Sequence, residues 1–176
     1  MMKHKFHLSV FGEVVPGRKL VYLLRVLASA TQEAASLLAY TTENGRSMTA
    51  EATTTTTKDG VMRAAGQPQV EITGTALLQK GDPMLGKLQA AMENGQLVEV
   101  WEANLDEPVT GQTNKFAGRY HQGYFTTLST TSNAEGNVEI QWTVAVNGAG
   151  VTGDVTVTAE QQDEASYVFE DTTQQS

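Results

Sequence analysis

The chain has 176 residues, of which 40% are hydrophobic, and its formal net charge is −8 with a pI near 4.8. This length and apolar content predict one domain with a packed core, and the acidic excess argues against a protein that grips nucleic acid, which needs clustered Lys and Arg. The sequence has no cysteine, which excludes disulfides, thiolate metal sites and cysteine nucleophiles. No apolar run approaches the ~18 residues of a membrane span, and the N-terminal apolar stretch is too short for a secretory signal.

The N-terminal third of the chain predicts one buried strand and one long polar arm. Residues 20–27, LVYLLRVL, form an apolar run with a single arginine, and the alanine-rich residues after it predict a turn or short helix before a strand that ends near Thr42. Residues 43–66 are polar and include the five threonines of residues 53–57. Threonine is β-branched and prefers strands, whereas a linker favours Gly and Ser. We therefore expect a hairpin-like arm that turns at residues 58–60, Lys-Asp-Gly.

The middle of the chain predicts a strand, a helix and a second strand. Residues 69–78, QVEITGTALL, alternate between apolar and polar side chains, which is typical of a half-buried strand, and residues 96–103, QLVEVWEA, predict a second strand. Between them, residues 82–94 predict a helix with Asp82 at the N-cap, proline at its first position and Gly95 just past its end. The apolar side chains that recur there at helical spacing are Met84, Leu85, Leu88 and Met92.

The last third of the chain predicts three more strands. Residues 115–130 predict a long strand with Leu128 and three aromatic side chains on one side, and residues 138–146 alternate between inward apolar and outward polar side chains. A shorter strand follows, and then a short helix that begins near Thr158. With roughly six or seven strands and one clear helix, the sequence predicts a mainly β fold: an antiparallel β-sandwich or barrel with a helix at about residues 82–94 on its flank and the long arm.

The three histidines do not predict a metal or catalytic site. His4 and His7 have a spacing that one turn of a helix can bring to a metal, but no third ligand lies nearby. His121 is isolated on a predicted strand, where we expect a half-exposed side chain. No serine lies in a nucleophile-elbow pattern, and the 16 glycines mark turns and form neither a P-loop nor a dinucleotide fingerprint. We therefore expect no cofactor and no metal.

Strand carboxylates are the remaining candidates for catalysis. Sheet geometry can pair such residues into an acid/base couple, but the sequence offers no pocket and no sugar-binding aromatic platform beside them. We interpret them as the solvated faces of half-buried strands and expect that the protein is not an enzyme. These carboxylates are Glu71, Glu99, Glu102 and Glu139.

The predicted sheet has edges that favour association with other chains. Unpaired edges invite pairing, and the residues that prevent it are scarce, since the chain has four prolines and none lies inside a predicted strand. An alternative is an immunoglobulin-like adhesin or carbohydrate-binding module of a phage or cell surface. Such modules expose aromatic platforms, whereas Trp101 and Trp142 lie within predicted strands at positions expected to be buried.

Four blocks of the sequence carry a resemblance to a known family. They are GRKLVYLLRVL (17–27), AYTTENGRSMTAEATTTTTKDGVMRAAG (39–66), VEITGTALLQKGDPMLGKLQAAMENGQLVEVWEANLD (70–106) and GRYHQGYFTTLSTTSNAEGNVEIQWTVAVNGAG (118–150). In order and spacing they resemble the major tail proteins, or tail-tube proteins, of long-tailed non-contractile siphophages that infect Gram-positive bacteria.

The resemblance implies a structural virion protein. Its subunits form hexameric rings that pool their strands into an inner β-barrel, and the rings stack into a tube through which DNA passes to the host without specific binding. It further implies a tail-tube domain at residues 17–170 with the arm inserted at about 43–66, an N-terminal arm or extended start at 1–16 and a polar tail at 171–176. The implied partners are other copies of the chain, a tape-measure protein, and tail terminator and tip proteins. The implied location is the virion, after assembly in the host cytoplasm, and no membrane is involved.

The resemblance and the polar strand pattern together predict two functional surfaces. We expect the arm to contact neighbouring subunits or successive rings, with a solvated hairpin without a partner as the alternative. The arm residues are Thr53, Thr54, Thr55, Thr56, Thr57, Lys58, Asp59, Gly60, Met62 and Arg63. The candidates for a lumen that repels phosphate, which serve equally as an outer solvated face, are Glu71, Thr73, Glu139, Gln141 and Thr143.

Overall fold

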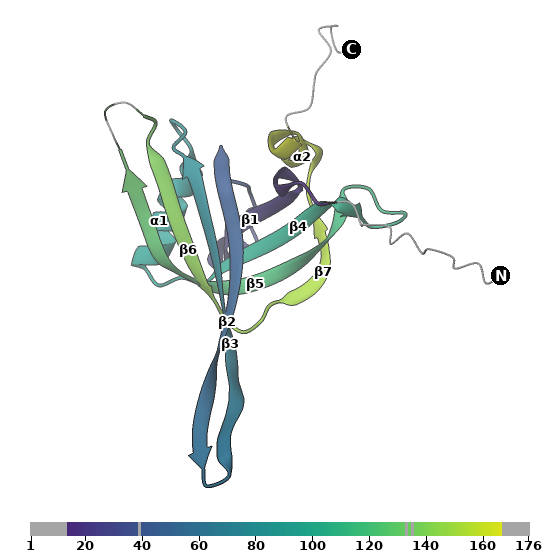
Figure 1. Ribbon diagram of the computed structural model, residues 1–176. Coiled ribbons are helices and arrows are strands. Elements are labelled where there is room, and N and C mark those ends of the chain that lie inside the picture. Colours follow the sequence, from purple (N-terminus) through teal and green to yellow (C-terminus); the bar gives the residue numbers. More distant parts are fainter. Residues whose placement is uncertain (1–13, 39, 133, 135, 167–176) are drawn as a thin grey trace, which may run out of the picture.

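The structure is a computed structural model that describes residues 14–38, 40–132, 134 and 136–166, and its body is one open antiparallel sheet (Figure 1). The seven strands follow the order β1-β4-β5-β6-β3-β2, with β7 paired to the first part of β5. The predicted mainly antiparallel β fold with a flanking helix is confirmed. The elements are η1 (Gly17–Lys19), β1 (Leu20–Val26), η2 (Leu27–Ser29), β2 (Thr41–Thr57), β3 (Gly60–Leu77), α1 (Pro83–Glu93), β4 (Val98–Pro108), β5 (Lys115–Thr131), β6 (Glu139–Val146), β7 (Val151–Thr156) and α2 (Ala159–Ser166).

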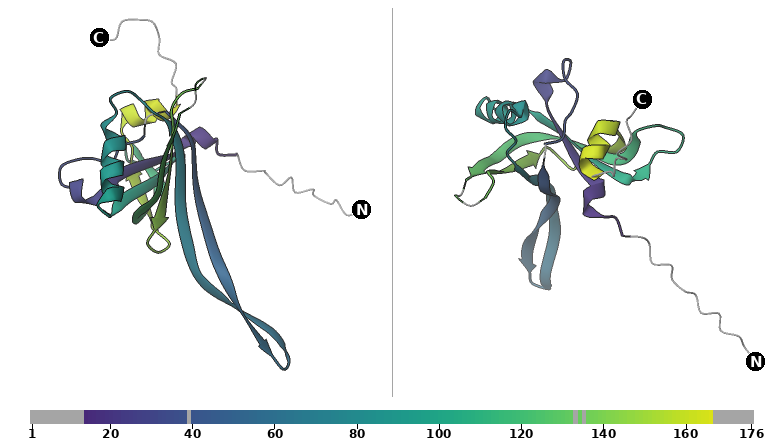
Figure 2. Two further views of the ribbon diagram at one scale, coloured as in Figure 1. Left: turned by 90° about the vertical axis from the view of Figure 1, so that its left-hand side faces the viewer. Right: turned by 90° about the horizontal axis from the view of Figure 1, so that it is seen from above.

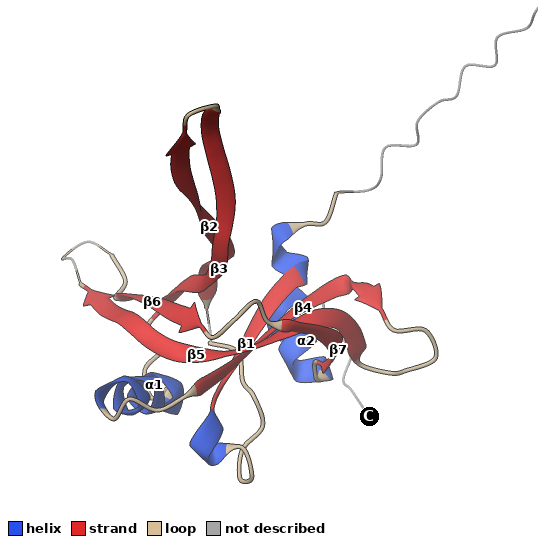
Figure 3. Ribbon diagram, turned by 90° about the horizontal axis from the view of Figure 1, so that it is seen from below, coloured by secondary structure: helices blue, strands red, loops and turns tan. Residues whose placement is uncertain are grey.

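Strands β1 and β4 are buried on both faces because two apolar clusters lie on opposite sides of them. On one side, Leu24 of β1 and Val100 of β4 pack with Leu88 of α1. On the other side, Leu23 packs with Val155 of β7 and with partly buried side chains that include one from α2. The two helices lie against different parts of the sheet (Figure 3). This double burial explains why β1 reads as a continuous apolar run rather than as an alternating one.

Helix α1 begins and ends where the sequence predicts. The side chain of Asp82 accepts a hydrogen bond from the backbone N–H of Met84 at 2.8 Å, Pro83 is the first helical residue, and Gly95 just beyond the end has φ 60°. The predicted apolar stripe is only partly correct, since Leu88 is fully buried but Met92 is 38% exposed.

The segment between β1 and the arm differs from the prediction. The strand near Thr42 begins there instead of ending, because β2 starts at Thr41. The preceding residues contain η2 and an isolated bridge between Leu24 and Ser36. At the other end of the chain the predicted short helix is present as α2. Thr158 and Gln161 form its capping box, in which Gln161 N–H donates to the Thr158 hydroxyl and Thr158 N–H donates to the Gln161 side chain.

A β-bulge in β5 reverses part of the predicted side-chain pattern. The pairing with β6 shifts between Phe125 and Thr127, so the residues after the bulge point to the opposite face from the one their spacing predicts. Leu128 therefore packs against the α1-side cluster, whereas the sequence pattern placed it with Tyr124, which is 42% exposed.

Candidate functional site

Strands β2 and β3 run past the rest of the sheet as a two-stranded arm, residues 49–69, that no other described element covers (Figures 1 and 2). The outermost pair between β3 and β6 is Val70 with Val146, whereas the β2–β3 ladder continues to Thr57 with Gly60. All residues of the arm are exposed except Gly66, which is half-buried. At about 3.3 Å per residue, the arm extends roughly 33 Å beyond the sheet.

The residues predicted for the contact arm all lie at its outer end. The predicted turn at residues 58–60 is present, with the Thr57 hydroxyl donating to the carbonyl of Gly60 at 2.9 Å. Gly60 has φ 139°, a conformation that favours glycine. The threonine run is the last part of β2, as its β-branched side chains predict. The structure therefore brings together Thr53, Thr54, Thr55, Thr56, Thr57, Lys58, Asp59, Gly60, Met62 and Arg63. Their role as contacts stays a prediction.

A β-bulge marks the place where the arm leaves the sheet. The register of β2 against β3 shifts between Ala50 and Ala52, and a bulge of this kind bends the ribbon and increases its twist. A Cβ atom on Gly66 would lie 2.4 Å from the carbonyl oxygen of Glu51, so only glycine fits there. Pro68 also lies within β3, contrary to the expectation that no proline is inside a strand. Its missing N–H is tolerated because β3 has no partner on its β6 side at that point.

An ion pair fixes the base of the arm to the sheet. Arg46 Nε lies 2.8 Å from Glu102 Oε2, and this oxygen also accepts a hydrogen bond from the hydroxyl of Tyr22 at 2.9 Å. Burial, followed by the neighbouring carboxylate, raises the pKa of Tyr22 far above its usual range, so the phenol is a neutral donor. The hydrogen bond to Glu102 is the main cause that raises the pKa of Arg46. Side chains from β2, β4 and β1 thus meet at one carboxylate.

The predicted lumen-facing residues share one uncovered face of β3 and β6. Thr73 and Thr143 are direct cross-strand partners, Gln141 is opposite Thr75, and Glu139 is opposite Leu77. Paired residues of an antiparallel ladder point to the same side, and the opposite side carries the buried core residues of both strands. The remaining predicted residue, Glu71, is exposed on the same face.

The structure extends this face to two further strands that sequence reasoning missed. Following the register from β2 to β5, the rows are Ser47–Glu71–Ala145–Tyr124, Gly45–Thr73–Thr143–Thr127, Glu43–Thr75–Gln141–Ser129 and Leu77–Glu139–Thr131. We call this set of residues the polar face. It carries three glutamates and no Lys, Arg or His, and none of its residues is buried. The alternation in β6 was visible in the sequence, but the pairing of β2 and β5 beside it was not.

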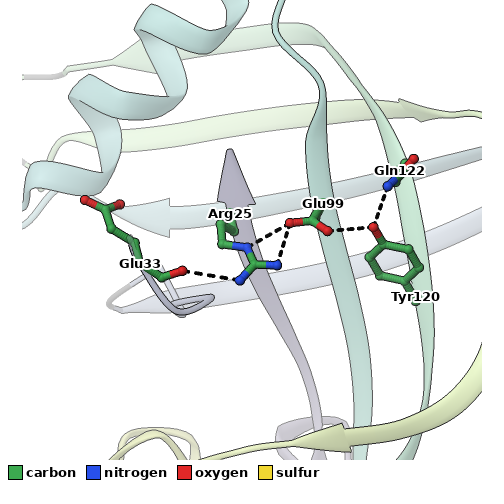
Figure 4. Close-up of polar contacts among 5 residues, drawn as sticks. All are labelled: Arg25, Glu33, Glu99, Tyr120 and Gln122. Atoms are coloured by element: carbon green, nitrogen blue, oxygen red, sulfur yellow. Dashed lines mark hydrogen bonds and ion pairs between the residues drawn. The ribbon is translucent and has the colours of Figure 1, made fainter. Parts of the chain in front are cut away.

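A chain of polar contacts joins β1, β4 and β5 (Figure 4), and its last member, Gln122, lies two residues from Tyr124 of the polar face. Arg25 of β1 places Nε and Nη2 at 2.8 and 2.7 Å from one carboxylate oxygen of Glu99, and the hydroxyl of Tyr120 donates to the other oxygen at 2.6 Å. The amide of Gln122 donates in turn to that hydroxyl. The guanidinium also lies 4.9 Å from the ring centre of Trp101, so its charge is stabilised from both sides.

The interpretation of all four strand carboxylates as solvated is wrong for two of them. Glu99 is 5% exposed, and the Glu102 side chain is 12% exposed in its pair with Arg46. The two do not form an acid/base couple, since alternation along β4 directs them to opposite faces. Each carboxylate is engaged in its own ion pair, so the role of both side chains is structural.

His121 is buried, contrary to the prediction of a half-exposed side chain. It is 1% exposed, neither ring nitrogen has a hydrogen-bond partner, and the ring packs so closely on Gly150 that a Cβ atom there would lie 2.2 Å from Nδ1. Burial lowers its pKa, so the ring is neutral. His4 and His7 lie outside the described residues. Across the described ranges no group of three His, Asp or Glu side chains is placed to hold a metal ion.

The distinctive surfaces of this mainly β fold are the exposed arm and the polar face. Trp142 is buried as expected, at 2% exposure, and Trp101 is half-buried beneath Arg25, so neither forms an open aromatic platform. Among the described helices, none is both long and apolar enough to cross a membrane.

The family is shown by comparison with known proteins. The model of a family described as phage tail tube protein matches residues 14–152, and the chain belongs to this family. A putative tail protein of Staphylococcus phage phiMR25 is 29% identical over 143 residues, which cover 79% of this chain and 74% of the relative. The protein is therefore a structural component of a phage tail, and the resemblance seen in the sequence is confirmed.

Solved tail structures share the fold. The tail tube of SPP1 aligns with a TM-score of 0.68 at 20% identity, and the alignment covers 86% of this chain and 84% of the SPP1 chain. The tail of a gene transfer agent particle, solved with C6 symmetry, aligns with a TM-score of 0.58 at 17% identity, and the alignment covers 78% of this chain and 98% of the tail chain.

Proposed function

We propose that this chain is the repeating subunit of a phage tail tube, in which hexameric rings stack and genomic DNA passes through the lumen to the host. The single observation that carries the proposal is the arm, a two-stranded ribbon exposed along nearly all of residues 49–69. An isolated two-stranded hairpin is only marginally stable in water. An arm of this length would therefore be stabilised by pairing with another chain, and a second subunit supplies that chain.

The sheet topology supports closure into a ring. The sheet is open, with β1 and β2 at the ends of the strand order, and within the described residues the bridge between Leu24 and Ser36 is the only pairing on their outer edges, so each subunit offers edges for further pairing. Joining such edges between subunits removes them, as in a closed barrel. The C6 symmetry of the gene transfer agent tail, which shares the fold, supports six copies per ring.

The polar face supports the passage of DNA. Glu43, Glu71 and Glu139 repel phosphate, and the face presents hydroxyl and amide groups without a basic side chain to hold the backbone. We therefore assign this face, including the predicted Thr73, Gln141 and Thr143, to the lumen. Further proposed partners are a tape-measure protein inside the tube and terminator and tip proteins at its ends, and assembly takes place in the host cytoplasm.

Shortening the arm tests the proposal. The variant replaces residues 53–64 with Asn-Gly, which closes a two-residue hairpin between Ala52 and Ala65, a pair already in register. We expect this variant to stay folded, by circular dichroism and urea unfolding, and to form no tubes in negative-stain microscopy under conditions where the full chain does. Tubes of normal length from the shortened protein would exclude the arm as the contact between rings.

A further inference from the structure

The far end of the arm exposes apolar side chains that have no function within the described part of the subunit. Met62 is 66% exposed and Val61 is 60% exposed. The cross-strand register places Met62 opposite Thr55 and Val61 opposite Thr56, so the two side chains lie on opposite faces of the ribbon. The Met62 face carries only threonines and Ala64 beside it and no charge. A flexible methionine on an uncharged face is suited to fill an irregular apolar gap.

A groove of matching character lies between α1 and the end of β5. Its volume is about 340 Å³, and its lining combines three apolar side chains with three polar ones. Within it, Met92 is 38% exposed although it lies on the helix face predicted to be apolar. The groove is lined by Leu85, Gln89, Met92, Glu93, Leu128 and Thr130.

The arm tip and the groove cannot meet within one subunit. The tip lies at one extreme of the molecule, far from α1, in every view (Figures 1 and 2). A contact between two different surfaces at separate ends of identical subunits is heterologous, and its repetition generates a closed ring or, where the rotation does not close, an open stack. The open stack is the geometry that successive rings of the proposed tube require.

Charge favours the same pairing. The chain as a whole has a net charge of −8, so unselected contacts between copies are repulsive. The outer end of the arm is locally basic, with Lys58 and Arg63 against the single carboxylate of Asp59. The rim of the groove carries Glu93, which accepts a hydrogen bond from the neutral amide of Gln89 and takes part in none of the ion pairs among the described residues.

We propose that the arm tip of one copy docks in the α1–β5 groove of a second copy, with Met62 as the apolar anchor and Lys58 beside Glu93. This inference rests on the proposed function, because it names the surface that the arm of one ring contacts on the next.

Paired cysteines test the contact, because the chain has no cysteine of its own. The test variant combines Met62→Cys with Met92→Cys, and the matched control combines Val61→Cys with Met92→Cys. A disulfide needs Cβ atoms about 4 Å apart, so we expect oxidised tubes of the test variant to give a ladder of covalent multimers with roughly tenfold more product than the control. Equal yields from the two variants, or no ladder from tubes that form normally, would overturn the docking site and leave the proposed function standing.

A charge exchange gives an independent readout that a misfolded variant cannot imitate. Lys58→Glu alone and Glu93→Lys alone should each reduce the yield of tubes, and the double variant should restore it. No recovery in the double variant would contradict the pairing of these two charges. If the unmodified protein forms no tubes at any concentration, both the proposed function and this inference fail.

Discussion

Replacing Arg25 with methionine should lower the free energy of unfolding by about 3 kcal/mol, because it leaves a buried carboxylate without its counter-charge. Glu99 is 5% exposed and receives both Nε and Nη2 of Arg25 on one oxygen. Methionine keeps most of the apolar stem, so the loss reports the charge and its hydrogen bonds more than the packing.

The magnitude follows from what remains around the carboxylate. Removing one partner of a buried ion pair costs about 3–5 kcal/mol, and the hydroxyl of Tyr120 still donates to Glu99 at 2.6 Å, which favours the lower end. The matched control is Lys87→Met. Lys87 and Glu33 are separated by the same 2.7 Å, but their side chains are 41% and 43% exposed, and exposed pairs contribute about 0–1 kcal/mol.

Equilibrium urea unfolding of dilute protein, followed by tryptophan fluorescence, measures both variants. The double variant Arg25→Met with Glu99→Met removes both charges together and should recover much of the lost stability, since apolar residues can replace a buried pair at little cost. The reasoning is refuted if Arg25→Met shifts the unfolding midpoint no further than Lys87→Met does. It is also refuted if the double variant is less stable than Arg25→Met alone.

Three further predictions concern the stability of the fold. Gly74→Ala should destabilise by about 1–3 kcal/mol in urea, because its Cβ would lie 2.4 Å from the buried ring of Trp142, whereas Gly45→Ala, with 3.4 Å to its nearest contact, should change stability by less than about 1 kcal/mol. Burial lowers the pKa of His121, so the unfolded state binds that proton more readily. Stability should fall as the pH drops below the unfolded value of about 6.5, and His121→Phe should reduce this fall between about pH 7.5 and about pH 5.5. Asp82→Ala removes the N-cap of α1 and should cost about 1 kcal/mol in the same assay.

The alternation of β3 and β6 was predictable because each of these strands is buried on one face only. Their apolar residues face the core and their polar residues face out, so the period of two is visible in the sequence. The same holds for α1, whose capping aspartate and proline are local signals. Elements whose environment is set by their own residues were therefore predicted correctly.

The predictions failed where residues far away in the sequence determine the burial or orientation of a side chain. His121 and Glu99 look like solvated strand residues, but their burial depends on the packing of other elements against them, including Gly150 on His121 and Arg25 on Glu99. The bulge between Phe125 and Thr127 contains no glycine or proline that would mark it in the sequence. These outcomes depend on pairing across the sheet, which a single sequence does not contain.

The polar face and the arm make opposing demands on assembly. Closing copies around a common axis would gather Glu43, Glu71 and Glu139 of every copy, and like charges within the ~8 Å Debye length of physiological salt repel. In the proposed tube, the face that we assign to the lumen therefore opposes ring closure, and the free energy of assembly has to come from other surfaces. The arm at residues 49–69 can supply it, because its exposed ribbon gains both backbone pairing and apolar contact from a neighbour. The β2–β3 hairpin thus contributes to both surfaces, since its base carries part of the polar face and its outer end is the arm. Its base is fixed by Arg46 to the sheet, and in the proposed tube its tip would provide the contact that offsets the repulsion.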